Sequence, residues 1–369
     1  MNTPQTPYPP DPPVLSRAPS YAPMPGARAR RPFSFWFAIL LLLMLLASLV
    51  ANAVLVAVIG ASRGLDAAER KLEEQVVEAA GAADKKIVLL PLEGVITSDE
   101  TASLFGVTEN LPAKIDAHLD QATLDRDVAA IVLAVNSPGG SVTASDKIWA
   151  RIERFKADRP DVKVVAYFDE VSASGGYYVS AGAHRIVAHP TCLTGSIGVI
   201  MSGYNVAELL TKLGVSPVVI KSSKSNLKDI MSSSRPMTEE ERAILQSIID
   251  ESYERFVDVI AKGRTGLSRE AVVAAATGTV YTAAQAKAKG LVDELGDLDA
   301  ACAAAKKLAG LASAQVVRYA SPPGLLALLN GPGYRAGAPS GELVLRVDPL
   351  AAADALRPRL FYLWGGGLR

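Results

Sequence analysis

The 369-residue chain has few of the residues that build the commonest catalytic and metal centres, since it holds only two cysteines and three histidines. Cys192 and Cys302 lie far apart and match no metal-binding or redox spacing, so we expect two buried thiols and no metal site. The chain also lacks net charge, because 38 acidic residues balance 38 basic ones. No general electrostatic field draws it to nucleic acid, and we expect no nucleic-acid partner.

Charged residues are absent between Arg31 and Arg63, where the run FWFAILLLLMLLASLVANAVLVAVIG fills the gap. About 20 apolar residues span a bilayer as a helix, whereas the apolar core of a secretory signal has about 7 to 15. The run therefore predicts a transmembrane helix over residues 33–62, embedded in the lipid bilayer, and disfavours a cleaved signal. The arginines that precede it place the N-terminus in the cytoplasm and everything after residue 62 outside.

The segments that flank this helix differ sharply in composition. Residues 1–32 carry ten of the 23 prolines and almost no aliphatic residues, which predicts a disordered cytoplasmic tail. Residues 63–84 are rich in Ala, Leu, Glu and Lys and free of proline, which predicts a helical stalk. Residues 321–369 are rich in Pro, Gly and Ala and end in LFYLWGGGLR, and no structure is assigned to them.

Residues 85–320 have the pattern of an α/β domain. Short β-branched apolar runs, such as KIVLLPLEGVI, AAIVLAVN, KVVAYFD, RIVAHP, SIGVIM and PVVIKS, alternate with amphipathic stretches. Runs that are apolar throughout are typical of buried parallel strands. The fold class we expect is α/β with a mainly parallel sheet, followed by helices that begin with capping boxes at Thr238 and Thr282.

Two glycine-containing loops follow predicted strands and lead into predicted helices. They are VNSPGGSV and DEVSASGGYY. Loops at the carboxyl ends of parallel strands hold binding sites, and the free N–H groups of a helix start can stabilise an oxyanion. Ser174, with the N–H of Gly175 beside it, is thus a candidate nucleophile, although a Ser-Gly-Gly triplet is more commonly a turn.

A nucleophilic serine needs a base, and the candidates are few. His118, His184 and His189 do not lie in a polar or glycine-rich cluster that would mark a catalytic triad. Lysine can serve when an apolar pocket keeps it neutral. Of Lys221, Lys224 and Lys228, only Lys228 has apolar neighbours on both sides, although a lysine-rich stretch is usually a solvated surface.

Several motifs, taken together and in order, resemble the signal peptide peptidase A family of the ClpP/crotonase superfamily, in its short form with one copy of the serine-bearing block. They are VNSPGGSV, SASGGYYVSAGA, LTGSIGVIM, LKDIMSSSRPMTEEERAILQSIIDESYERFVDVIAKGR and GTVYTAAQAKAKGLVDELG. The resemblance implies a catalytic nucleophile at Ser174, a general base at Lys228 and a serine at Ser196 that orients the lysine and the deacylating water. It also implies oxyanion donors at Gly140 and Gly175.

The function that this resemblance implies is a single-pass serine endopeptidase of the bacterial cytoplasmic membrane, with a ClpP/crotonase-like domain outside the cytoplasm. Its substrates would be cleaved signal peptides and other peptides in or near the membrane. It would need no cofactor and would form a homo-oligomer. The loop KSSKSNLKD is two residues longer than the family's usual spacing, which keeps Lys224 as a second candidate base.

Three other functions stay open at this point. A crotonase-type acyl-CoA enzyme would share the fold, but a domain outside the cytoplasm would not meet acyl-CoA. A related membrane protease that acts on a stomatin-like partner would share the Ser-Lys chemistry. A catalytically inactive scaffold would keep the fold and lose the dyad.

Overall fold

The computed structural model describes residues 33–66, 72–79, 84–98, 101–103, 106–108, 110–320 and 360–363. The chain divides into two compact units, Met1–Glu69 and Arg70–Arg369. The predicted tail, residues 1–32, and most of residues 321–369 lie outside the described residues.

The described residues of the first unit form one helix, α1 (Phe33–Asp66), over the predicted apolar run. Its stretch Trp36–Ala53 has a mean hydropathy of 2.3, and none of that stretch is buried in protein. By length and composition this helix could cross a membrane.

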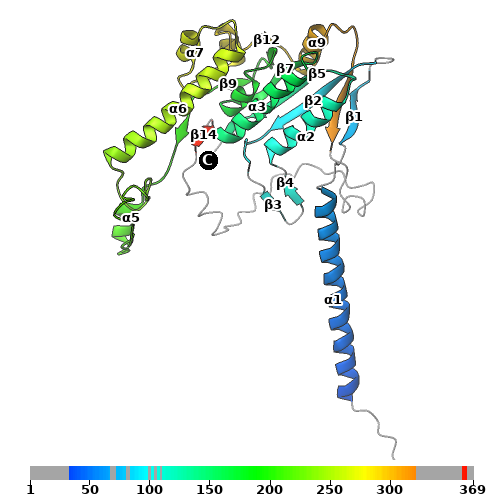
Figure 1. Ribbon diagram of the computed structural model, residues 1–369, viewed down its shortest axis with the longest axis vertical. Coiled ribbons are helices and arrows are strands. Elements are labelled where there is room, and N and C mark those ends of the chain that lie inside the picture. The colour runs from blue at the N-terminus through cyan, green and yellow to red at the C-terminus, as the bar shows by residue number, and fades with distance from the viewer. Residues whose placement is uncertain are drawn as a thin grey trace, which may run out of the picture. The chain divides into compact units, whose positions relative to one another are not determined.

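The second unit is built on a nine-stranded, mainly parallel sheet with the order β1-β13-β2-β5-β7-β8-β12, and β9 and β11 extend it beside β7 (Figure 1). The strands are β1 (Glu73–Glu78), β2 (Lys86–Glu93), β5 (Val128–Ser137), β7 (Lys163–Ala173), β8 (Arg185–Ala188), β9 (Leu193–Gly195), β11 (Val280–Thr282), β12 (Glu294–Leu295) and β13 (Gln315–Ala320). The pairs β1–β13 and β9–β11 are antiparallel, and the others are parallel. The predicted α/β fold class is confirmed.

Helices cover both faces of this sheet, whereas α5 (Ala207–Lys212) lies away from it (Figure 1). The other helices of this unit are α2 (Leu111–Leu124), α3 (Val142–Asp158), α4 (Gly175–Ser180), α6 (Glu239–Gly263), α7 (Arg269–Ala275), α8 (Ala283–Ala288) and α9 (Leu298–Leu308). Successive strand residues point to opposite faces, so Val88 and Leu90 pack in the core that includes α2, α3, α4 and α6, while Ile87 and Leu89 pack against α9. Burial on both faces explains why the central strands are apolar throughout.

Within the described ranges, five short strands lie outside this sheet. β3 (Thr101–Ser103) pairs with β4 (Gly106–Thr108). β6 (Gly139–Ser141), β10 (Ile200–Met201) and β14 (Leu360–Leu363) form a separate three-stranded sheet. The described end of the chain therefore lies beside the SPGG loop.

Two predictions of local structure are wrong. The stalk predicted as a helix over residues 63–84 is helical only to Asp66 among its described residues, and Glu73–Glu78 form the edge strand β1. Pairing with β13 outweighs the helix propensity of this segment, and its fully exposed, glutamate-rich strand is typical of a sheet edge. PVVIKS, predicted as a strand, is an exposed segment without regular structure.

The two cysteines are buried and free, as the sequence predicts. Burial raises the pKa of Cys192 to about 12 and that of Cys302 to about 11. Neither thiol is therefore suited to act as a nucleophile.

Candidate active site

Ser174 occupies a sharp turn between the end of β7 and the start of α4. Its backbone has φ 53° and ψ −114°, a conformation that costs a non-glycine residue about 1–3 kcal/mol. The turn is held on both sides, because Ser174 N–H donates to the Gly195 carbonyl at 2.8 Å and the Ser174 carbonyl accepts from Tyr178 N–H at 2.8 Å.

The Ser174 side chain is buried, with 1% of its residue surface exposed. Its Oγ has no hydrogen-bond partner among the described residues of this chain. An unpaired buried hydroxyl costs about 1–3 kcal/mol and is uncommon unless the group has a chemical role. The arrangement is that expected of a nucleophile that waits for a base and a substrate.

The SPGG loop brings the backbone of Gly140 against Gly175. A Cβ added to Gly175 would lie 3.1 Å from Gly140 N, so only glycine allows this approach without displacing a neighbour. The loop is fixed by Ser137, whose Oγ donates to the Gly94 carbonyl at 2.6 Å and accepts from Gly139 N–H at 3.1 Å.

Gly175 is the first residue of α4, so its N–H is not used by the helix ladder. The Gly140 backbone nitrogen lies beside it. Together they place two backbone donors next to the Ser174 turn, which is the composition of an oxyanion hole.

Ser196 follows β9, and β9 lies beside the end of β7 with Gly195 opposite Ala173. Ser196 is buried, has a positive φ of 48°, and donates its N–H to the Thr279 carbonyl at 2.8 Å. The fold thus brings the predicted residues Ser174, Gly175, Gly140 and Ser196 to one place.

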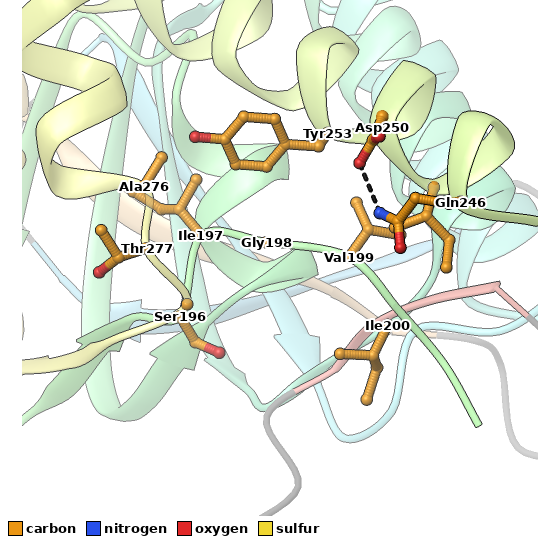
Figure 2. A pocket seen from close by; sticks show the side chains of 12 residues that line it. Ser196, Ile197, Gly198, Val199, Ile200, Gln246, Asp250, Tyr253, Ala276 and Thr277 are labelled. Atoms are coloured by element: carbon orange, nitrogen blue, oxygen red, sulfur yellow. Dashed lines mark hydrogen bonds between the residues drawn. The ribbon is translucent and has the colours of Figure 1, made fainter. Parts of the chain in front are cut away.

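Ser196 also lines a hollow of about 530 Å³ between the segment after β9 and α6 (Figure 2). Its wall is partly apolar, with Ile197, Ile249 and Tyr253 among the lining residues. Gln246 and Asp250, on α6, are joined across one side of it by a 2.8 Å hydrogen bond from Nε2 to Oδ1.

Lys228 lies elsewhere, in the segment that connects α5 with α6. Figure 1 shows α5 beyond the amino end of α6, away from the sheet. Lys228 and Lys224 are both exposed, and no hydrogen bond joins either lysine to Ser174. Within one described chain, the predicted dyad is therefore not assembled.

An ion-pair network that the sequence did not reveal fixes the turn next to Lys228. Arg235 contacts the carboxylate of Asp229 at 2.9 Å and also pairs with Glu241 in the first turn of α6, while Lys221 contacts Asp229 at 2.6 Å. Hydrogen bonds from Arg235 lower the pKa of Asp229 well below its usual range and that of Glu241 to about 2. The Thr238–Glu241 capping box was visible in the sequence, but the pairing of Glu241 with Arg235 was not.

None of the three histidines is hydrogen-bonded to the Ser174 hydroxyl. The Nδ1 of His184 accepts the N–H of Val164 at 3.0 Å, and that of His189 lies 2.8 Å from the Thr191 hydroxyl. Burial, followed by the charge of Lys114, lowers the pKa of His118 to about 4. In the described part of the chain, no group of three or more His, Cys, Asp or Glu residues could hold a metal ion.

Comparisons with known proteins identify relatives of this chain. The sequence model of peptidase family S49 matches residues 156–312 of this chain. A protein of Enterococcus faecium assigned as signal peptide peptidase SppA is 38% identical over 249 residues, which cover 68% of this chain and 71% of that protein. Protease 4 of Salmonella typhi is 40% identical over 211 residues, which cover 57% of this chain and 33% of that protein.

Among solved structures, a variant of the 1510-N membrane-bound stomatin-specific protease matches with a TM-score of 0.39 and 18% identity, over 59% of this chain and 83% of that one. A ClpP1 variant from Listeria monocytogenes matches with a TM-score of 0.36 and 19% identity, over 57% of this chain and 92% of that one.

Proposed function

The chain belongs to peptidase family S49 and is a serine peptidase, and from this premise we propose that it is a membrane-anchored endopeptidase that uses a Ser-Lys dyad on signal peptides released in the membrane. The observation that carries the proposal is the Ser174 hydroxyl, which is buried and unpartnered at a strained turn beside the backbone nitrogens of Gly140 and Gly175.

In this mechanism, neutral Lys228 takes the proton of Ser174 Oγ, and the oxygen attacks the peptide carbonyl carbon. The N–H groups of Gly140 and Gly175 donate hydrogen bonds to the oxyanion, an arrangement whose loss typically lowers kcat about 10²- to 10³-fold per donor. The C–N bond then breaks, the leaving amine takes the proton from Lys228, and an ester to Ser174 remains. Lys228 next accepts a proton from water, whose oxygen attacks the ester carbonyl carbon. As the bond to Ser174 Oγ breaks, Lys228 returns that proton to Oγ, which restores the hydroxyl and the neutral amine.

We propose that Lys228 reaches Ser174 from a neighbouring subunit of a homo-oligomer. The connection between β10 and α6 exposes apolar side chains, with Leu213 66%, Val218 85% and Ile220 94% exposed in the single chain. Apolar side chains gathered in this way mark an interaction surface, and α5 itself buries none of its residues in the chain's own core. A second copy packed on this segment would remove that surface from water.

The hollow beside Ser196 supports this arrangement. It is lined by Ser196, the residue after Gly195, whose carbonyl accepts the Ser174 N–H, and its volume is large enough to admit a lysine side chain. Its partly apolar wall would favour the neutral amine that a general base requires. The Ser196 hydroxyl could then accept a hydrogen bond from that amine and direct its lone pair toward Ser174.

Membrane anchoring is proposed on α1, which has the length and apolarity of a spanning helix. The arginines before it favour an N-terminus in the cytoplasm and a catalytic unit outside. An enzyme held in this way would meet peptides left in the bilayer. The names of its relatives as a signal peptide peptidase and as protease 4 support peptide substrates of this kind.

The test is hydrolysis of a synthetic signal peptide by the detergent-solubilised full chain, compared with its Ser174→Ala and Lys228→Ala variants. Wild-type cleavage with loss of activity in both folded variants is expected. Cleavage by Ser174→Ala at the wild-type rate would contradict the assignment of the nucleophile. An inactive wild type that gives no adduct at Ser174 with a serine-directed reagent would favour an inactive scaffold.

Coexpression of the two variants tests the subunit arrangement. If the dyad forms between subunits, the intact Ser174 of one chain meets the intact Lys228 of the other, and mixed oligomers regain activity. Mixed oligomers that remain inactive would place the base in the same chain as the nucleophile.

A further inference from the structure

A second hollow, of about 340 Å³, lies toward the β1 edge of the sheet, between α2 and the ends of β2 and β13. Figure 1 shows α2 alongside β2 and near β1. A volume of this size suits a small organic molecule. None of the described residues that line it lines the hollow beside Ser196. This second hollow, the α2 hollow, is therefore a separate site.

The α2 hollow opens where two neighbouring strands stop pairing. β2 continues to Glu93 and β13 to Ala320, but their pairing ends with Leu89 opposite Arg318. Pro91 has no N–H to donate to a neighbouring strand, and proline within a sheet is typical of places where a ladder is interrupted. Pro91, Glu93 and Ala320 line the hollow beyond the last pair.

Two buried polar groups in the wall of the α2 hollow lack hydrogen-bond partners. His118 on α2 is 3% exposed and Tyr319 on β13 is 2% exposed, and their rings pack edge to face with centroids 6.0 Å apart. Among the described residues, neither His118 Nδ1 nor the Tyr319 hydroxyl has a partner. Buried polar groups are nearly always paired, so two unpaired groups beside a hollow point to a ligand that supplies the partner.

Both groups are neutral at physiological pH and can donate hydrogen bonds. Burial, followed by the charge of Lys114, lowers the pKa of His118 to about 4, and burial raises the pKa of Tyr319 well above its usual range. The phenol O–H donates, and a neutral imidazole can carry its N–H on Nδ1. Two such donors match the two oxygens of a carboxylate.

The charged residues of the wall favour an anion with a single negative charge. Among the described lining residues, Lys114 and Arg318 are basic and Glu93 is acidic, which leaves one positive charge in excess. Lys114 is near His118, since its charge contributes to the lowered pKa of that imidazole. The carboxylate of Glu93 repels a multiply charged anion such as phosphate and can pair with an ammonium group.

Leu111 and Pro91 add apolar surface to the same wall. We propose that the α2 hollow binds a small carboxylate of amino-acid size with an aliphatic side chain, either a free amino acid or the end of a short peptide. The Tyr319 hydroxyl and His118 Nδ1 donate to the carboxylate oxygens, and Lys114 supplies the opposite charge. This inference goes beyond the proposed peptidase, because the site takes no part in the proposed chemistry.

The first experiment measures ligand binding to the detergent-solubilised full chain carrying Ser174→Ala, the parent chain, so that no peptide is cleaved. Ligand-observed NMR should give L-leucine a Kd on the order of 1 mM, which suits so small a molecule. Leucinamide keeps the side chain and the amino group but lacks the carboxylate, and it should bind at least about tenfold more weakly. Equal binding of the two, or tighter binding of inorganic phosphate, would overturn the inference.

Glycyl-L-leucine distinguishes the two sources of the carboxylate. It has the same terminal carboxylate and side chain as leucine, but its ammonium group is one residue away. Binding at least as tight as that of leucine would assign the hollow to peptide ends, and weaker binding would assign it to free amino acids. If neither leucine nor glycyl-L-leucine binds, the inference is wrong.

Two substitutions test whether the ligand lies in the α2 hollow. Tyr319→Phe removes one hydroxyl and Lys114→Gln removes one charge, and each should raise the Kd for leucine about tenfold or more, as loss of a hydrogen bond to a charged group does. Lys147→Gln, at an exposed position of α3 outside the hollow, is the matched control and should bind as the parent chain does. Unchanged affinity in both Tyr319→Phe and Lys114→Gln would place leucine at another site, the hollow beside Ser196 included, and would overturn the inference.

Thermal unfolding separates a ligand contact from a structural role of Tyr319. Without ligand, Tyr319→Phe should unfold at no lower temperature than the parent chain, because the hydroxyl has no described partner to lose. Leucine at about ten times its Kd should raise the unfolding midpoint of the parent chain by about 3 to 6 °C, and that of Tyr319→Phe by less than half as much.

The contrary result is a Tyr319→Phe chain that unfolds at a lower temperature without ligand and binds leucine as tightly as the parent chain. The hydroxyl would then serve the fold alone, and the inference would fall. Because every chain in these measurements carries Ser174→Ala, failure of the proposed peptidase would leave their outcomes unchanged.

Discussion

Replacement of Gly140 by alanine should inactivate the enzyme without unfolding it. A Cβ at this position would lie 2.0 Å from the Ile96 carbonyl oxygen and 2.6 Å from Ile96 N. Both are backbone atoms, so no side-chain rotation can relieve the contact. To reach an ordinary separation of 3.4 Å, the two segments must move apart by about 1.4 Å, the difference between 3.4 and 2.0 Å.

That displacement has two consequences of different size. Ile96 N–H donates to the Gly139 carbonyl at 2.9 Å, and Ser141 N–H donates to the Ile96 carbonyl at 2.8 Å, so the shift breaks two hydrogen bonds worth about 0.5–1.5 kcal/mol each. A loss of about 1–3 kcal/mol leaves most domains folded. The Gly140 N–H, however, moves by more than 1 Å from the oxyanion, and kcat should fall about 10²- to 10³-fold.

The assay is kcat on a fluorogenic peptide, with the active fraction titrated by a serine-directed reagent and folding followed by circular dichroism. Gly266→Ala is the matched control, because its Cβ would meet nothing within 4 Å, and it should keep wild-type kcat. A folded Gly140→Ala enzyme whose kcat stays within about threefold of wild type would refute the oxyanion role of this loop.

Three further changes probe the base, its loop and the fold. Lys228→Arg should be as inactive as Lys228→Ala in the same assay, because a guanidinium does not give up its proton, and an active arginine variant would overturn the choice of base. Arg235→Lys should lower kcat about tenfold with little change in KM, because lysine cannot hold both Asp229 and Glu241 by paired hydrogen bonds, and an unchanged kcat would show that Lys228 does not depend on this network. The pKa of His118 falls on burial from 6.5 to about 4, so the unfolded chain binds this proton more strongly and stability should decrease as the pH falls from about 6.5 to about 4. When the free energy of unfolding is measured in urea at several pH values, this group should contribute a slope of up to about 1.4 kcal/mol per pH unit between these two pKa values. His118→Gln should reduce that slope. An equal slope in both proteins would assign the effect to other groups.

The sequence predicts the parts of this protein in which local pattern and burial agree. The central strands are apolar because both faces are covered, and their glycine-containing loops identify Gly140, Ser174 and Gly175 as neighbours at the strand ends. β1 escaped prediction because its glutamates favour a helix, and only pairing with β13, more than 200 residues away, makes it a strand. The same holds for β14, whose partners lie in two distant segments.

The position of Lys228 relative to Ser174 could not be predicted for another reason. A family motif identifies residue types along the chain, and spacing along the chain does not determine a distance in space. The connection that carries Lys228 contributes little to the chain's own core, and α5 contributes nothing. On our proposal, this connection packs against a second copy of the chain. In the sequence, such a contact shows only as apolar side chains, which do not reveal what covers them.

Backbone strain points independently to Ser174, to Ser196 and to the loop that carries Lys228. Among the described residues other than glycine, positive φ occurs at Ser174, Ser196 and Met231. The first is the proposed nucleophile, the second the proposed orienting serine, and the third lies three residues after the proposed base. Such conformations cost about 1–3 kcal/mol each and persist where the surrounding structure enforces them, most often at functional sites. Strained conformations without a functional role would not be expected at both the nucleophile and the loop of a lysine far from it in the sequence. A dyad that is completed on assembly requires a fixed backbone geometry at both places.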